Sequence, residues 1–300
     1  MSNQEVTTTI NHELCTGCGM CIQVCPSNTI SMINGKAAVT GSHSMNCGHC
    51  ESTCPTGAIK VGALKEEFSY RSFRPEDRWL PHGTFEPAQL DRLLRSRRSC
   101  RNYTNKQVPL EILYDLINFG ITAPSGTNSQ QWTFTLVPTR EKLIVLGGQV
   151  ADFFHKLNQK AANPVLRAIS KIFYKDRLGK YHQNHYTSVQ HGLKDWYIHK
   201  KDTLFHGATA AIIIGSKPGA SCPQDDALMA SQNILLGAHA LGLGSCMIGY
   251  AVHAANLSAT IKPALTIPAE ETVYACIALG YPREEYSRLT HRKKPVIRIV

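Results

Sequence analysis

Two short runs of cysteine hold the residues of this 300-residue chain that are best suited to chemistry. The first run reads Cys15-x2-Cys18-x2-Cys21-x3-Cys25-Pro26. Cysteines at every third residue of a short loop can point several thiolates at one cuboidal iron–sulfur cluster, and this pattern is typical of bacterial 4Fe–4S sites. The fourth cysteine of the pattern reaches a different cluster. The spacing therefore predicts a second set of ligands elsewhere in the chain.

A second cysteine run supplies such a set. It contains Cys47, Cys50 and Cys54 and, like the first, ends in Cys-Pro. It repeats the first run with an offset of 29 residues, so the counterpart of Cys15 is Ser44. A serine oxygen is harder and far less acidic than a thiolate, and it is normally a poor ligand for iron. A disulfide or a zinc site is the alternative, which two Cys-Pro endings in register disfavour.

Residues 5–62 resemble the two-cluster bacterial ferredoxins. The resemblance implies one 4Fe–4S cluster on Cys15, Cys18, Cys21 and Cys54, and a second cluster on Cys25, Cys47 and Cys50. Ser44 leaves three outcomes open: a 4Fe–4S cluster with Ser44, water or His43 at its fourth iron, a 3Fe–4S cluster, or no stable second cluster. We expect a second cluster, because Gly17, Gly19 and Gly48 let backbone N–H groups approach the sulfur atoms at both places.

Length and composition set broad limits on the rest of the chain. Three hundred residues, 43% of them hydrophobic, favour about two domains with a substantial core. We expect no transmembrane segment, because no apolar run reaches 18 residues. The first residues lack the basic and apolar regions of a secretory signal. Four of the eleven cysteines lie outside the two runs without a disulfide framework, so we expect a cytoplasmic protein, of an anaerobe.

The charge of the chain is unevenly distributed. Residues 1–64 have a net charge of −1 in a chain of net charge +10, so residues 65–300 carry +11. A strongly basic domain beside a cluster domain favours an anionic cofactor, an acidic electron donor, or both. Nucleic acid is the competing partner, and we expect none, because the basic residues are spread out and no nucleic-acid-binding module is recognised.

A charged, aromatic and proline-interrupted stretch indicates a linker at 65–85, between an N-terminal domain at 1–64 and a larger domain at 86–300. Strands at 29–32 and 36–39 flank Asn34-Gly35, a strong signal for a type I′ hairpin, and a further strand is expected at 58–61. The linker holds several aromatic residues, which suggests that it packs against a body. These are Phe68, Tyr70, Phe73 and Trp79.

In the larger domain, helices are expected at 86–97, from 108 to about 117, at 139–160 and at 226–241. Strands are expected at 132–137, 209–215 and 272–279. Helices that alternate with a few strands favour an α+β fold with a central sheet.

Three stretches of this domain could bind a flat phosphorylated ligand. The first holds Arg97, Arg98, Ser99 and Arg101, whose forked guanidinium donors suit a phosphate or a polar ring edge. A solvated basic patch is the alternative. The second stretch, 123–132, is dense in small polar groups, although it could be an ordinary connecting loop. The third, 242–250, has glycines that allow close approach of the backbone, but it is not a Rossmann fingerprint.

Together, in this order and with 278–282 and 292–295, the stretches resemble the FMN-dependent nitroreductase family over about residues 86–300. The resemblance implies a nitroreductase-like α/β/α sandwich and an obligate homodimer with one FMN at each end of the interface. It assigns FMN contacts to Arg97, Arg98, Ser99, Arg101, Arg292 and Lys293, to the backbone at Met247, Ile248 and Gly249, and, from the other subunit, to Pro124, Ser125, Gly126 and Asn128. Two departures are Gln131, where proline is common, and Cys100 inside the arginine run.

The two resemblances imply a flavin oxidoreductase that carries electrons from iron–sulfur clusters through FMN to a small planar acceptor, such as a nitroaromatic, a quinone or an activated alkene. Ferredoxin or flavodoxin is the expected donor. No protein nucleophile or general base is expected, because the chemistry takes place on FMN. Two alternatives remain open: an NAD(P)H-driven flavin reductase, and a redox sensor or electron-transfer module without a small substrate of its own.

Two further features have competing interpretations. Cys246 is more often a small buried apolar residue than a redox-active one. The segment 150–205 has a net charge of +6, and we interpret it as a solvated insertion rather than a metal site at His182, His185 and His191. Its apolar face could cover substrate, contact a second subunit or lie on a membrane surface. This face comprises Val165, Ile169, Ile172 and Phe173.

Overall fold

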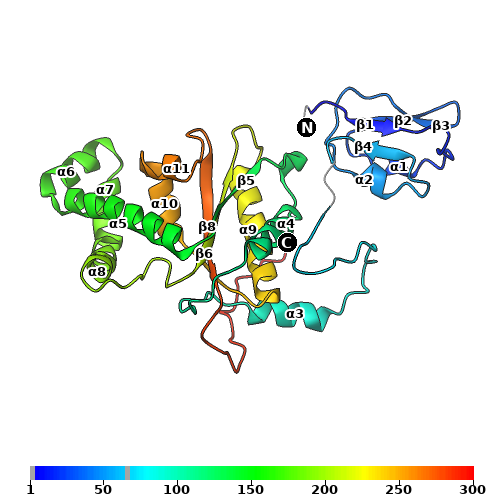
Figure 1. Ribbon diagram of the computed structural model, residues 1–300. Helices are drawn as coiled ribbons and strands as arrows, with labels where there is room; N and C mark the ends of the chain where they lie inside the picture. The colour runs from blue at the N-terminus through cyan, green and yellow to red at the C-terminus, as the bar shows by residue number, and fades with distance from the viewer. Residues whose placement is uncertain (1–3, 65–67) are drawn as a thin grey trace.

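The computed structural model describes residues 4–64 and 68–300, and it divides the chain into a small N-terminal domain and a larger body (Figure 1). The small domain contains β1 (Thr8–Ile10), α1 (Met20–Gln23), β2 (Ile30–Ile33), β3 (Lys36–Val39), α2 (His49–Ser52) and β4 (Ile59–Val61). Strands β2 and β3 form the predicted hairpin, with both Asn34 and Gly35 at positive φ. Strand β1, which the sequence pattern did not predict, pairs antiparallel with β4.

The connecting segment is fastened to helix α4 (Leu110–Ile121). The carboxylate of Asp115, fully buried on α4, accepts hydrogen bonds from the backbone N–H groups of Arg71 and Ser72, both at 2.8 Å. Tyr70 and Phe73 stack around Phe119 of the same helix. The prediction that the segment packs against a body is therefore confirmed.

Two of the four aromatic residues named for that packing do not take part. Trp79 is 73% exposed and Phe68 is 50% exposed. Trp79 instead meets the ring of His82, within its own loop, edge to face. Of the four, only Tyr70 and Phe73 contact Phe119, and Phe73 is still 38% exposed.

The body is built on a four-stranded antiparallel sheet of order β5-β6-β8-β7. Its strands are β5 (Trp132–Val137), β6 (Ala210–Ser216), β7 (Gly244–Met247) and β8 (Thr272–Gly280). Its helical segments are α3 (Pro87–Ser96), α4, η1 (Gly126–Asn128), α5 (Arg140–Ala162), α6 (Pro164–Phe173), α7 (Arg177–Asn184), α8 (Tyr186–Tyr197), α9 (Pro223–Ala240), α10 (Gly249–Leu257) and α11 (Ile261–Ala264). The predicted helices and strands are present, and β7 is the strand that the sequence pattern missed.

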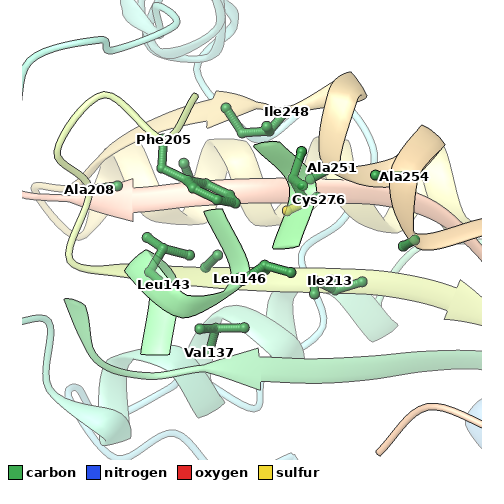
Figure 2. Packing of buried hydrophobic residues seen from close by; sticks show 14 of the residues in the cluster. Val137, Leu143, Leu146, Phe205, Ala208, Ile213, Ile248, Ala251, Ala254 and Cys276 are labelled. Carbon is green, nitrogen blue, oxygen red and sulfur yellow. The ribbon is translucent and has the colours of Figure 1, made fainter. Parts of the chain in front are cut away.

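Helices cover both faces of the sheet. Every residue of β6 is buried, and the strand's side chains alternate between two hydrophobic clusters. Ile213 packs with residues of α5 and α10 such as Leu143 and Ala251, as Figure 2 shows. Ile212 faces the opposite side and packs with α4 and α9. This arrangement confirms the α+β class and the predicted α/β/α sandwich.

The segment 150–205 is an ordered helical part of the body rather than a solvated insertion. Phe154 of α5 and Val189 of α8 are buried in the same cluster as the sheet residues. The apolar face predicted from Val165 to Phe173 lies on α6 and is largely exposed. Within residues 4–64 and 68–300, no group of three His, Cys, Asp or Glu side chains is placed to bind a single metal ion, and no helix is long and apolar enough to cross a membrane.

Candidate active site

The cysteines of the small domain surround two separate cavities. One cavity is lined by Cys15, Cys18, Cys21 and Cys54, the set implied by the ferredoxin resemblance. Backbone N–H groups point at the sulfur atoms: that of Ala37 lies 3.5 Å from Cys15 Sγ, and that of Ala58 lies 3.3 Å from Cys54 Sγ. The N–H groups of Ala37 and Gly17 lower the pKa of Cys15, which favours the thiolate that binds iron.

The other cavity is lined by Cys25, Cys47 and Cys50 together with Ser44. The backbone N–H of Thr29 lies 3.3 Å from Cys25 Sγ. In both sets the cysteines line one shared cavity, and among the described residues no group of three such side chains is placed to hold a single metal ion. Thiolate ligands spread around a void, with N–H donors aimed at them, fit a multi-iron cluster in both places.

Ser44 occupies the position equivalent to Cys15 in three dimensions as well as in sequence. The backbone N–H of Asn46 donates to Ser44 Oγ at 3.0 Å, as the N–H of Gly17 does to the sulfur of Cys15. Gly17 and Asn46, which are also 29 residues apart, share the left-handed conformation with φ of 73° and 47°. The predicted register of the repeat is confirmed. Whether Ser44 ligates iron stays a prediction.

In the body, the arginine run is held against β7. Ser99 forms a parallel bridge with Ser245, and the N–H of Cys100 donates to the carbonyl of Ser245 at 2.9 Å. The hydroxyl of Tyr103, which is buried, donates back to the carbonyl of Cys100 at 2.9 Å. These contacts place two of the predicted FMN-binding stretches side by side, although they are about 150 residues apart in sequence.

A basic cleft of about 510 Å³ opens beside this bridge. Burial and the positive charges of Arg292 and Arg98 lower the pKa of Arg97, which also lies in the cleft. The carboxylate of Glu284 contributes to the lining, but no salt bridge among the described residues involves Arg97, Arg98 or Arg292. Close guanidinium groups without a carboxylate partner fit a bound phosphate.

Arg98 of the arginine run is joined to the C-terminal segment of the chain. The side chain of Arg98 donates to the hydroxyl of Thr290 in the C-terminal segment, and the side chain of Arg292 donates to the same hydroxyl at 3.3 Å. Lys293 is exposed in that segment. Arg292 and Lys293, the C-terminal residues predicted to contact the phosphate, do not line the cleft themselves, although Thr290 does.

A second pocket, of about 550 Å³, lies at the C-terminal end of β7, where Cys246 and Met247 line it, whereas Gly244 and Ser245 line the basic cleft. Arg101 lines it together with the predicted residues Met247, Ile248 and Gly249. Helix α10 begins at Gly249, so backbone N–H groups without partners in the helix face the pocket. Most of the other side chains that line this pocket are aromatic rings or imidazoles. It comprises Phe154, Tyr181, His185, Thr203, Leu204, His206, Cys246, Tyr250 and His253.

Sequence reasoning did not assign these imidazoles and phenols to the flavin site. Tyr250 ends the predicted stretch 242–250 and His253 follows it on α10, so their nearness to Met247–Gly249 could have been found. His185 was considered only with His182 and His191, as a metal site, and His206, from a distant segment, gave no signal. Burial lowers the pKa of His206, and the charge of Arg101 lowers it further against the opposing effect of Asp202. A neutral imidazole can donate one hydrogen bond and accept another.

Cys246 is buried, with 3% of its surface exposed, and it belongs to the hydrophobic cluster behind the pocket. Burial raises the pKa of its thiol. Both observations support the interpretation of Cys246 as a small apolar residue.

The remaining predicted stretch, which holds Pro124–Asn128, lies away from the arginine run and from 242–250. The N–H of Gly126 donates at 2.8 Å to Asp226, near the first residue of α9. Arg97 lies beside His239 at the opposite end of α9. At a rise of 1.5 Å per residue, the thirteen residues between Asp226 and His239 separate the two places by about 20 Å. One chain alone therefore does not bring this loop to its own arginine run.

The loop instead contacts the small domain. The side-chain amide of Asn128 donates to the carbonyls of Met45 and Asn46, at 3.1 and 3.0 Å. The side chain of Gln4 approaches the carbonyl of Thr127 at 3.4 Å. Sequence reasoning found Asn128 but did not find this contact.

Comparison with known proteins agrees with both parts of this architecture. Residues 94–281 match the model of the nitroreductase family, and residues 8–31 match that of the 4Fe-4S binding domain. A protein of Archaeoglobus fulgidus, named as an NADH dehydrogenase/NAD(P)H nitroreductase, is 26% identical over 65% of this chain and 86% of its own length. The 4-nitrobenzoate reductase of a Nocardioides species is 24% identical over 64% of this chain and 79% of its own length.

Solved structures of nitroreductases are also similar to part of this chain. A crystal structure of a nitroreductase with bound FMN from Bacteroides fragilis has a TM-score of 0.49 and 22% identity, and the match covers 71% of this chain and 98% of that one. The family match spans more than half of the chain. The chain therefore belongs to the nitroreductase family of flavin oxidoreductases and carries an N-terminal 4Fe–4S binding domain.

Proposed function

We propose that the protein passes electrons from two iron–sulfur clusters in its small domain, through FMN, to a small planar acceptor. The observation that carries the proposal is the pairing, at β7, of a carboxylate-poor arginine cleft with a pocket lined by Arg101 and Met247–Gly249. A flat ligand with a phosphate tail needs both: a cationic site for the tail and a larger, partly apolar site for the ring.

Each residue then has a stated task. The guanidinium of Arg97 binds the phosphate, with Arg98, Ser99 and the C-terminal Arg292 and Lys293 around the mouth of the cleft. Arg101 donates to the polar edge of the ring. The backbone of Met247–Gly249, at the start of α10, supplies N–H donors to the ring's opposite edge. FMN, when bound, supplies the capacity to accept electrons singly and to deliver them in pairs.

The pocket also suits an acceptor above the flavin. Phe154 and Tyr250, which meet edge to face with ring centroids 5.2 Å apart, provide an apolar wall for a planar molecule. His206 and His253 line the same pocket, and a neutral imidazole there can donate a hydrogen bond to an acceptor that gains electrons. Nitroaromatics, quinones and activated alkenes meet these requirements.

The remaining assignments rest on fewer observations. A homodimer with FMN at its interface is supported by the separation of about 20 Å between the Pro124–Asn128 loop and the chain's own arginine run. A cytoplasmic location is supported by cysteines that are all unbridged in the structure. Reduced ferredoxin or flavodoxin is the proposed donor, because a cluster domain accepts electrons one at a time.

A nicotinamide donor is the second candidate, favoured by the name of the Archaeoglobus fulgidus relative. One anaerobic experiment separates the two donors. Iron and FMN are counted per chain, and the flavin absorbance is then followed after mixing with reduced ferredoxin and, separately, with NADH or NADPH. We expect seven or eight irons, one FMN and rapid bleaching by ferredoxin. Rapid bleaching by a nicotinamide alone would overturn the proposed direction of flow, and absence of FMN would overturn the whole proposal.

A further inference from the structure

In the part of the chain that the structure describes, the hydrogen bonds between the two domains are confined to one contact. On the side of the small domain it involves Gln4, Met45 and Asn46, and on the side of the body it involves Thr127 and Asn128. Figure 1 shows the small domain beside the body on the side of α4 and α9, away from α5–α8. The connecting segment holds the small domain near this place through its hydrogen bonds to Asp115.

The contact lies at the second cysteine cavity and not at the first. Met45 and Asn46 line the cavity that holds Cys47 and Ser44. The residues that line the first cavity make no hydrogen bond to the body within the described part of the chain. Of the two clusters, the one with the serine position is therefore the one held against the body.

Asn46 connects the cavity to the contact. It is 5% exposed, and its backbone N–H donates to Ser44 while its carbonyl accepts from the Asn128 amide. Its own side chain donates to Glu5 O at 3.0 Å and accepts from the Thr7 hydroxyl at 3.0 Å. With every polar group of the residue engaged, the edge of the cavity is fixed relative to the loop of the body.

The loop itself is rigidly built. Thr127 has φ of 52°, a conformation that a β-branched residue adopts only when its surroundings impose it. The N–H of Gly126 and the hydroxyl of Ser129 both donate to the carboxylate of Asp226, which is 3% exposed. The loop thus presents the small domain at a set position.

We infer that electrons leave the small domain through the cluster on Cys25, Cys47 and Cys50, at the edge held by Asn128, and enter the flavin of the partner subunit rather than that of their own chain. The inference rests on the proposed function. A chain's own arginine run is about 20 Å from this loop along α9, and electron tunnelling weakens steeply with distance. In a dimer whose flavin lies between the loop of one subunit and the arginine run of the other, the short path crosses the interface.

The transfer is balanced by an external reductant. Reduced ferredoxin, or dithionite in the test tube, is oxidised and supplies two electrons one at a time, the clusters pass them on, and FMN takes them up with protons from solvent. No bond of the protein is made or broken.

A mixed dimer of two complementary chains tests the direction. In one chain, Cys47→Ala and Cys50→Ala remove the second cluster and leave the flavin site. In the other, Arg97→Ala and Arg101→Ala weaken the flavin site and leave the clusters. Different affinity tags isolate the heterodimer. The flavin of the first chain should bleach with reduced ferredoxin at a rate close to that of the wild type, because the intact clusters belong to the partner subunit.

Electron transfer within one chain would give the opposite result in the mixed dimer. If transfer stays within one chain, the heterodimer's flavin will bleach no faster than that of the Cys47→Ala/Cys50→Ala homodimer, and the inference is overturned. Iron and FMN contents of the wild type and of each mixed dimer, measured beforehand, distinguish this result from a failure of the proposed function, in which the wild type itself would lack one cofactor.

A structural readout tests the contact without turnover. Asn128→Ala removes two hydrogen bonds to the edge of the cavity, so amide hydrogen exchange at residues 44–47 should accelerate by roughly tenfold, with iron content unchanged. Asn118→Ala is the matched control, because it removes a side-chain amide bond from α4 to the connecting segment, 2.7 Å to Ser69 O, and leaves the edge untouched. Equal exchange at 44–47 in Asn128→Ala and the wild type would refute the assigned role of Asn128.

Discussion

At the scale of single residues, the small domain keeps the geometry of a cysteine position while changing its chemistry. Ser44 has the backbone environment of Cys15, including the N–H donor two residues later. An N–H that stabilises a thiolate can also donate to a serine oxygen, so the fold itself tolerates the exchange. Only the iron affinity of the position is altered.

Ser44→Cys is therefore expected to produce a conventional four-cysteine site with little change in stability. Iron per chain should rise toward eight if the native second cluster has three irons. If the native cluster already has four, its EPR signal should change while iron stays constant. Unchanged iron content together with an unchanged EPR spectrum would contradict the assignment of Ser44 to the fourth ligand position.

Arg97→Ala is expected to weaken FMN binding by roughly ten- to a hundredfold without abolishing it, because one charge-assisted hydrogen bond contributes about 1.5–3 kcal/mol. Fluorescence titration of the flavin-free protein measures the effect. Arg74→Ala, which removes an exposed arginine of the connecting segment, is the control and should bind FMN normally. Equal affinity of Arg97→Ala and the wild type would exclude the cleft as the phosphate site.

At the scale of elements, two helices organise the functional parts. Helix α9 separates the loop that contacts the small domain from the arginine run, and its length sets the distance between them. Helix α4 holds the connecting segment through one buried carboxylate, so the position of the small domain depends on a residue of the body. Both roles depend on which residues the ends and faces of these helices contact. They do not depend on the intrinsic helix propensity of the residues.

Asp115→Ala should lower the free energy of unfolding by about 2–4 kcal/mol, because the N–H groups of Arg71 and Ser72 lose a charged acceptor whose side chain is fully buried. Asp115→Asn keeps one acceptor oxygen and should lose less. Urea unfolding of the three proteins gives the comparison. An exposed carboxylate of the preceding turn, Glu111, supplies the control Glu111→Ala, which should be nearly neutral. If Asp115→Ala and Glu111→Ala unfold alike, the clamp is not important for stability.

At the scale of the whole molecule, a slightly acidic cluster domain is joined to a strongly basic flavin domain through a contact at one cluster. The chain holds the cysteine-lined cavities and the candidate flavin site in one polypeptide, so the proposed electron transfer would not depend on diffusion between separate proteins. Two half-buried histidines that line the candidate flavin pockets, His206 and His239, make the stability of the protein depend on pH.

Burial lowers the folded-state pKa of His239 and of His206 below the unfolded value of about 6.5. Above that pH neither state binds the proton. As the pH falls below about 6.5, the unfolded chain takes up protons that the folded chain excludes, so the free energy of unfolding should decrease. Anaerobic urea unfolding at pH 7.5 and 5.5 measures the change, and His206→Gln should reduce it. A protein that becomes more stable on acidification over this range would contradict the prediction.

The features that could be predicted from the amino-acid sequence are the local ones. Ligand spacing within a short loop is a matter of a few residues, so the cysteine runs, their 29-residue repeat and the place of Ser44 could be predicted without a structure. The same holds for β2–β3, whose Asn34-Gly35 turn is encoded at the turn, and for β6 and α9, whose apolar runs are long. The nitroreductase-like sandwich followed from several such stretches taken in order.

Which of these features contact one another could be learned only from the three-dimensional structure. The pairing of Ser99 with Ser245, the histidines from distant segments around one pocket, and the amide of Asn128 on the edge of the second cysteine cavity each join parts of the chain that are many residues apart. Such contacts depend on the packing of whole helices and strands against one sheet. No local pattern of residue types encodes them, because each depends on how distant parts of the chain pack together.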